Sequence, residues 1–246
     1  DKAALYIFAD KNKINRFEGF LGLVPNDETS GKLLFTGNLD LNLNNIFHIG
    51  ENIQLSWKRI QIQSQTLNLS VDFPYLFYSS FAIDACFALE KCDTSYLNLD
   101  IVAGVRYYAW ENGYVRTYYE YQNSQLINNQ NLQFLTFLPQ NLDYTINWYG
   151  LSLNFKHLDY IFNPRKGYNI EINTAIGKKM IQKNINIPQE LYNGIQTKST
   201  QIKAIINADL YFPIKKRWTW VIALKSAYLQ SPTLCENELF KIGGLN

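Results

Sequence analysis

Histidine, methionine and cysteine are scarce in this sequence of 246 residues, with two, one and three copies. The cysteines, Cys86, Cys92 and Cys235, fit neither a metal-ligand spacing nor a disulfide framework. A disulfide between Cys86 and Cys92 stays open, but two unrelated thiols are the favoured interpretation. The histidines, His48 and His157, fall in or beside expected turns, without a serine or cysteine partner at motif spacing. These absences leave little material for a metal centre or a nucleophilic catalytic site.

Long apolar runs and a dominant charge are also absent. No segment approaches the ~18 apolar residues of a membrane-spanning helix, although 47% of the residues are hydrophobic. The 23 basic and 21 acidic residues leave a net charge of +2. With so small a net charge, the protein has no strong positive electrostatic field that would attract a polyanion. Nucleic acid is therefore not expected as a partner.

What the sequence does contain is a two-residue alternation of apolar and polar side chains. In SFAIDACFALE the apolar residues Phe81, Ile83, Ala85, Phe87 and Leu89 are separated by small or polar ones. The same alternation runs through TLNLSVDF, GYNIEINTAIG and TQIKAIINADLYF. Side chains alternate between the two faces of a β-strand, so this period predicts strands with one apolar and one wet face. Helical periodicity is hardly visible, and we expect an all-β chain.

The alternating segments have ~9–12 residues, enough for a tilted strand to cross a bilayer and more than the ~5–6 of an ordinary soluble strand. Short connections at 111–113, 163–167 and 212–217 contrast with long ones at 124–142 and 179–199. This asymmetry is typical of an antiparallel transmembrane β-barrel with its short turns in the periplasm. We expect strands at 3–10, 16–24, 33–43, 51–61, 65–73, 80–90, 96–109, 113–123, 143–155, 167–178, 200–212 and 217–229.

The charged residues of these strands fall on the face opposite the apolar one, as in a water-filled lumen. The strands of a soluble sandwich or a lipocalin-like barrel also alternate between apolar and polar residues, but their apolar face is packed as the core. A turn centred on Asn112 would place Arg106 opposite Tyr118 and diagonal to Glu120, which predicts an Arg106–Glu120 contact. The expected lumen-facing charges are Asp84, Asp100, Arg106, Arg116, Glu120, Glu171, Lys203 and Asp209.

No enzyme is expected. Asp84 and Asp100 could be imagined as a catalytic carboxylate pair. However, inward-facing acidic residues on adjacent strands lie near each other whether or not they are catalytic. The sequence GKK at 177–179 lacks the upstream glycine of a phosphate loop and ends a strand instead of opening a helix. We therefore predict no catalytic residue, no metal and no cofactor.

Three segments resemble motifs of one family, the BamA/TamA-type outer-membrane assembly barrels. The stretch from Ile14 to Trp57 resembles the family's opening, with a glycine-containing first strand and a turn from Asn45 to Glu51. FNPRKGYNIEINTAIG resembles the segment in which a Pro-x-x-Gly turn, here Pro164 to Gly167, leads into a strand. ELFKIGGLN resembles the start of the long sixth extracellular loop, at Phe240, Gly243 and Gly244. The motifs occur in the family's order and span essentially the whole chain.

The resemblance implies a domain organisation. Residues 1–14 would end a periplasmic POTRA domain, and residues 15–246 would form the N-terminal part of the barrel, about eleven of about sixteen strands. The chain would break off inside the sixth loop, before the family's Arg-Gly-aromatic motif and its acidic partners. The bacterial outer membrane is the implied location.

The resemblance also implies a function, the insertion and assembly of other outer-membrane proteins through a lateral gate. The gate would be the first strand, Arg16, Phe17, Glu18, Gly19, Phe20, Leu21 and Gly22, where two glycines would weaken pairing. An open alternative is that these glycines only permit curvature or aromatic packing. Implied partners are outer-membrane lipids, nascent outer-membrane proteins and accessory assembly lipoproteins. Two other functions stay open: a two-partner secretion-type export pore, and an unrelated porin or surface-binding barrel.

Overall fold

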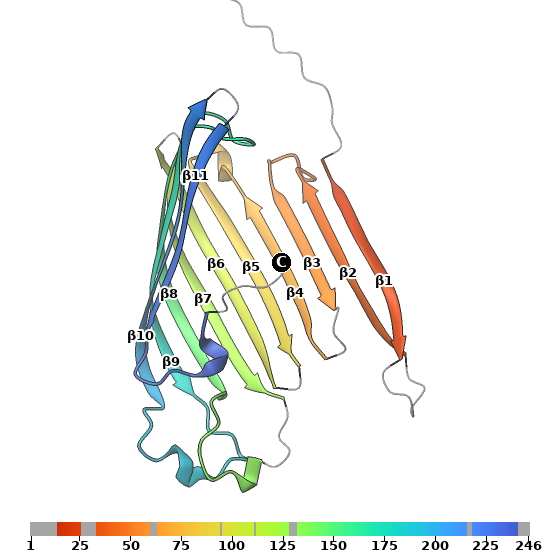
Figure 1. The fold of residues 1–246 in the computed structure, drawn as a ribbon, viewed down its shortest axis with the longest axis vertical. Coiled ribbons are helices and arrows are strands. Elements are labelled where there is room, and N and C mark those ends of the chain that lie inside the picture. Colours follow the sequence, from red (N-terminus) through yellow and green to blue (C-terminus); the bar gives the residue numbers. More distant parts are fainter. Residues whose placement is uncertain are drawn as a thin grey trace, which may run out of the picture.

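The computed structural model describes residues 14–25, 33–59, 63–93, 95–110, 112–127, 132–215 and 218–240. In these ranges the chain forms eleven β-strands in one antiparallel sheet, with four short 3-10 helices between or after them (Figure 1). The strands follow one another in the sheet in chain order. The predicted all-β antiparallel fold is confirmed. The strand expected at 3–10, and with it the POTRA assignment, lies outside the described residues.

The strand boundaries agree with the alternation of the sequence to within a few residues. Strands β6 to β10 have 14–18 residues and extend beyond their predicted limits. The strands are β1 (Arg16–Pro25), β2 (Leu33–Asn44), β3 (Asn52–Arg59), β4 (Gln65–Phe73), β5 (Phe81–Cys92), β6 (Tyr96–Trp110), β7 (Gly113–Leu126), β8 (Tyr144–Leu158), β9 (Gly167–Ile181), β10 (Lys198–Lys215) and β11 (Trp218–Gln230). The 3-10 helices are η1 (Leu76–Tyr78), η2 (Leu132–Phe134), η3 (Gln189–Tyr192) and η4 (Glu236–Glu238).

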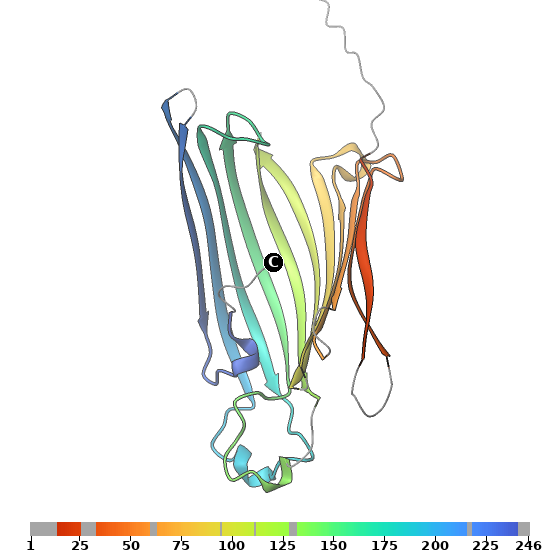
Figure 2. The ribbon, with the colours of Figure 1, turned by 45° about the vertical axis from the view of Figure 1, so that its right-hand side comes forward.

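The sheet is curved, and the segment that follows β11 lies inside the curve (Figures 1 and 2). We call the concave side the inner face and the convex side the outer face. Residues directly opposite in neighbouring strands share a face, so the register assigns every strand residue. The row Ile83, Val105, Thr117 and Leu151 lies on the outer face, and the row Asn52, Asp72 and Asp84 on the inner face.

The outer face is apolar although no other element covers it within the described ranges. Ile176, Trp220 and Ile222 remain 57%, 67% and 52% exposed. In a soluble sandwich these side chains would form the core. The buried hydrophobic cluster lies instead at one end of the inner face, where Tyr144, Ile146 and Trp148 of β8 pack with residues of the long loops.

The two long connections lie at one end of the sheet, and the connections that the sequence predicted to be short lie at the other (Figure 1). The β7–β8 and β9–β10 loops meet at the lower end of the view, where Asn184 Nδ2 donates to Asp143 Oδ2 at 2.6 Å. The β2–β3, β8–β9 and β10–β11 turns lie at the upper end. The predicted separation is therefore confirmed for the connections named from the sequence, whereas the short β5–β6 connection lies at the long-loop end.

The predicted register between β6 and β7 is wrong. Arg106 lies opposite Arg116, and Tyr118 lies opposite Gly104. An irregularity between Tyr107 and Trp110 shifts the pairing before the turn. The displacement is two residues, so every side chain keeps its face, but the predicted Arg106–Glu120 contact is not formed.

The open question of a Cys86–Cys92 disulfide is also answered. Both residues belong to β5, and six residues of a strand span about 20 Å, far beyond the reach of a disulfide. All three cysteines of the sequence are described and are free thiols.

Candidate functional site

The inner face carries a chain of ion pairs across β4 to β7. Arg106 Nη2 lies 3.2 Å from Asp72 Oδ1 and 3.4 Å from Asp84 Oδ1. Arg116 Nε lies 2.9 Å from Asp84 Oδ1, and its Nη2 donates to Asp84 Oδ2. Gly104 leaves the space for this guanidinium, because a Cβ there would lie 2.6 Å from Arg116 Nε. Three of the predicted lumen-facing charges thus belong to one network.

A second ion pair joins strands that are not neighbours. Lys203 of β10 donates to both carboxylate oxygens of Glu120 on β7, at 2.8 and 2.7 Å. Its Nζ lies 4.4 Å from the ring centroid of Trp148 on β8, and the Trp148 ring in turn covers Gly177 of β9. Asp100 lines the same cavity of about 290 Å³. The contact can form because the sheet curves toward its inner face.

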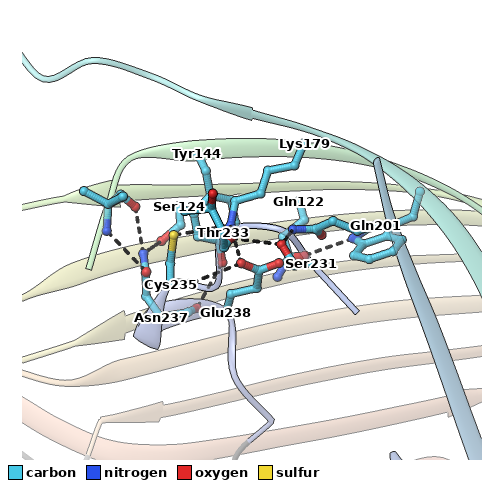
Figure 3. A network of polar contacts seen from close by, with 12 residues as sticks. Gln122, Ser124, Tyr144, Lys179, Gln201, Ser231, Thr233, Cys235, Asn237 and Glu238 are labelled. Carbon is cyan, nitrogen blue, oxygen red and sulfur yellow. Dashed lines mark hydrogen bonds and ion pairs between the residues drawn. The ribbon is translucent and has the colours of Figure 1, made fainter. Parts of the chain in front are cut away.

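A third network fixes the segment of residues 231–240, which we call the inner segment (Figure 3). Lys179 of β9 and Glu238 of η4 form an ion pair, and their side chains are 0% and 1% exposed. Lys179 Nζ also donates to the Thr233 carbonyl at 3.0 Å and lies 3.3 Å from Cys235 Sγ. Burial raises the pKa of the Cys235 thiol, although the Lys179 ammonium works against the shift.

Asn237 completes the attachment of the inner segment. Its Nδ2 donates to Ser124 Oγ at 2.7 Å and to the Leu142 carbonyl at 2.9 Å, and Tyr144 Oη donates to its carbonyl at 3.0 Å. At the start of the segment, Gln201 Nε2 donates to Ser231 Oγ at 2.6 Å. Because buried polar groups need partners, these bonds hold the segment in one position against β7 to β10.

The remaining predicted charges lie on the inner face outside these networks. Glu171 accepts a bond from Asn173 Nδ2 at 3.3 Å, and Asp209 lies opposite Asn169 and Ala223. The alternation did not identify Asp72, Lys179 or Glu238 as site residues. Lys179 continues the inward series once β9 extends to Ile181, whereas Glu238 lies in no alternating segment.

The predicted gate residues form strand β1 at one edge of the sheet. Within the described residues β1 pairs only with β2, from Arg16 opposite Asn42 to Pro25 opposite Leu33. A Cβ on Gly19 would lie 2.6 Å from the Asn38 carbonyl oxygen, so close approach of β2 requires this glycine. Arg16 and Glu18 form an exposed ion pair at 2.6 Å.

Strand β1 carries large exposed apolar side chains on both faces, as does β11 at the other edge of the sheet, where Val221 lies on the inner face and is 54% exposed. Phe17 and Leu21 lie on the outer face and are 70% and 64% exposed. Phe20, opposite Asn38, lies on the inner face and is 61% exposed. Together with its unpaired edge, this gives β1 a surface that can accept a further strand.

Each of the two turn motifs depends on a residue of its own, Glu51 in one and Gly167 in the other. Glu51 is 1% exposed, and its carboxylate accepts from the Phe47 and Ile49 amides at 2.5 and 3.3 Å. Burial opposes its ionisation, but these hydrogen bonds outweigh burial and hold the pKa of Glu51 below its ordinary value. In the β8–β9 turn, Gly167 has a φ of +120°, and a Cβ there would lie 1.9 Å from the His157 carbonyl oxygen. Both turns therefore depend on the residues that define the motifs.

Neither a metal-ligand group nor a membrane-spanning helix is found in the described residues. No three His, Cys, Asp or Glu side chains in these ranges gather into a group that could hold a metal ion. Nor does any helix in them have the length and hydrophobicity to cross a membrane. Of the residues predicted for the sixth loop, Phe240 lines the cavity beside Asp100, and Gly243 and Gly244 lie outside the described ranges.

A curved antiparallel sheet with an apolar outer face and an ion-paired inner face defines a partial β-barrel. Its fold is similar to the crystal structure of BamA from Haemophilus ducreyi lacking POTRA domains 1–3, with a TM-score of 0.55 and 16% sequence identity. The match covers 93% of this chain and 49% of the BamA chain, so the chain spans about half the length of that protein. No protein-family model and no curated protein matches the sequence. At this identity the likeness concerns the fold.

Proposed function

We propose that this chain is the N-terminal part of a bacterial outer-membrane β-barrel that inserts and assembles other outer-membrane proteins. The proposal rests on the distribution of apolar and charged residues between the two faces of the sheet. Exposed aliphatic and aromatic residues cover the outer face, while ion pairs such as Arg116–Asp84 and Lys203–Glu120 lie on the inner face. A barrel wall in lipid around an aqueous lumen needs this distribution. The similarity to the BamA fold supports the proposal.

The gate in this proposal is the free edge of β1. An unpaired strand edge offers backbone donors and acceptors to an incoming strand, which can add to the sheet by β-augmentation. In the complete barrel this edge would pair loosely with the last strand, and nascent outer-membrane proteins would enter there. Strand addition uses backbone hydrogen bonds, so the function needs no cofactor or catalytic group. A preceding POTRA domain and accessory lipoproteins would deliver the substrates.

The test is a disulfide lock in the full-length protein, with Cys86, Cys92 and Cys235 replaced by alanine. Phe17→Cys is combined with a cysteine directly opposite in the last strand. We expect slow growth and low levels of outer-membrane proteins, both restored by a reductant. The matched control combines Phe17→Cys with Leu41→Cys, which lie opposite each other in β1 and β2 and should lock without effect. Undiminished insertion with a locked last strand would contradict the gate.

A further inference from the structure

Two neighbouring turns at the short-connection end are tied together by a side chain. Arg165 of the β8–β9 turn donates from Nη2 to the carbonyl oxygen of Lys215 at the end of β10, at 2.9 Å. Between the turns lies a shallow depression of about 370 Å³, lined by Asp159, Arg165, Lys166, Pro213, Ile214 and Lys215. The lining thus contains three cationic side chains and one carboxylate.

The single carboxylate is already engaged. Asp159 Oδ1 accepts from the backbone amides of Tyr160, Arg165 and Lys166 at 3.0, 2.9 and 3.1 Å. These amide bonds, those of Arg165 and Lys166 above all, hold the pKa of Asp159 below its ordinary value. Asp159 therefore shapes the turn, and the depression keeps an excess of positive charge toward solvent.

The depression adjoins the aromatic edge of the outer face. Lys215 lies opposite Trp218, and the next outer pair along the two strands is Phe212 and Trp220. Trp218 and Trp220 are 71% and 67% exposed. In a membrane protein, aromatic side chains collect at the level of the lipid headgroups, and neighbouring Lys and Arg side chains extend toward the phosphates.

We propose that this depression binds the phosphate of an anionic phospholipid in the periplasmic leaflet, with the acyl chains on Phe212 and Trp220. The proposal rests on the proposed function in one respect, that the outer face lies in the membrane. Arg165, Lys166 and Lys215 supply three positive charges around the depression, which suit a phosphate group. A zwitterionic lipid carries its own ammonium group, which the cationic lining disfavours.

The experiment uses the full-length protein in nanodiscs of equal parts phosphatidylglycerol, phosphatidylethanolamine and phosphatidylcholine. Lipids retained after release are counted by native mass spectrometry. We expect the wild type to retain phosphatidylglycerol preferentially. The variant R165Q/K166Q/K215Q should lose this preference about tenfold or more, because it removes the three charged donors that line the depression and would contact the phosphate. Excess inorganic phosphate should not displace the lipid.

The matched control K178Q/K183Q/K198Q removes the same charge near the long-loop end and should retain phosphatidylglycerol as the wild type does. Equal retention of the three lipids by the wild type would overturn the proposal, as would an equal loss in both variants or displacement by inorganic phosphate. Heat-modified migration of each variant on gels shows that it is folded. A protein that inserts its substrates but retains no phosphatidylglycerol contradicts this site alone, whereas a protein that does not enter the bilayer contradicts the proposed function as well.

Discussion

Lys203 and Glu120 form an ion pair across two intervening strands, with Lys203 Nζ 2.7 and 2.8 Å from the two carboxylate oxygens. Their strands, β10 and β7, are separated in the sheet by β8 and β9. In a flat sheet three strand spacings amount to about 14 Å, more than the two side chains could bridge. The ion pair therefore forms because the sheet is curved, and it stabilises this curvature.

Removing one partner of this pair should destabilise the curved wall. We expect Lys203→Met or Glu120→Gln to cost about 1–3 kcal/mol of unfolding free energy, because hydrogen bonds to charged groups are lost and the remaining charge stays half-buried. The double variant should cost less than the sum of the two single variants. Urea unfolding of the four proteins in lipid checks this. Strictly additive costs would show that the two side chains do not interact.

Breaking the Lys179–Glu238 pair should release the inner segment. Cys235 is 1% exposed, and only its exposed thiolate would react with a maleimide. In a protein with Cys86 and Cys92 replaced by alanine, Glu238→Gln leaves Lys179 buried without its counterion, at a cost of about 3 kcal/mol. Labelling of Cys235 should then be faster by on the order of 100-fold.

Glu236→Gln is the control for this experiment, because Glu236 lies in the same 3-10 helix but is exposed. Its Cys235 should label as slowly as that of the wild type. Equal labelling rates for Glu238→Gln and Glu236→Gln would show that the ion pair does not hold the inner segment.

The strands and their faces could be predicted from the sequence because a local property determines them. Side chains alternate along every strand, so the spacing of apolar residues in β5 or β10 fixes the face of each residue whatever the partner strand. The inner position of Asp84, Arg106, Arg116, Glu120 and Lys203 followed from this rule alone.

Contacts between distant residues could not be predicted in the same way. The β6–β7 register shifts just before Trp110, whose Nε1 donates to the Asn154 carbonyl on β8 at 3.1 Å and whose ring stacks on Phe155 at 5.0 Å. The Lys179–Glu238 pair joins residues 59 positions apart. No local pattern in the sequence predicts either contact. Centring the β6–β7 turn on Asn112 therefore placed Arg106 opposite Tyr118, and the alternation gave no indication of the inner segment.

Gly167 should tolerate no side chain. Its φ of +120° disfavours L-residues, and a Cβ would meet the His157 carbonyl oxygen at 1.9 Å. We expect Gly167→Ala to cost about 3 kcal/mol of unfolding free energy. Gly194→Ala is the control: its φ is +86°, but nothing lies within 4 Å of its Cβ, so about 1 kcal/mol is expected. A Gly167→Ala variant as stable as Gly194→Ala would contradict the described turn.

The β8–β9 turn should weaken in acid through Asp159. Amide hydrogen bonds lower the pKa of this carboxyl from its ordinary 3.8. A group with a lowered folded-state pKa contributes stability above its unfolded pKa and loses it as the pH falls through the folded one. The difference in unfolding free energy between wild type and Asp159→Asn should be constant near neutral pH and shrink below about pH 4. A difference that does not change between about pH 6 and about pH 2 would contradict this role.

The central claim is that the outer face meets lipid and the inner face meets water. The most direct measurement places spin labels singly at Ile206 and Ala208 on the outer face of β10 and at Asn207 and Asp209 on its inner face, in the full-length protein in bilayers. Relaxation by oxygen, which concentrates in lipid, is compared with relaxation by a water-soluble nickel chelate. We predict that positions 206 and 208 respond to oxygen and positions 207 and 209 to nickel, with a period of two. Protection of 206 and 208 from both reagents would mean that the apolar face is a packed soluble core, and would contradict the account.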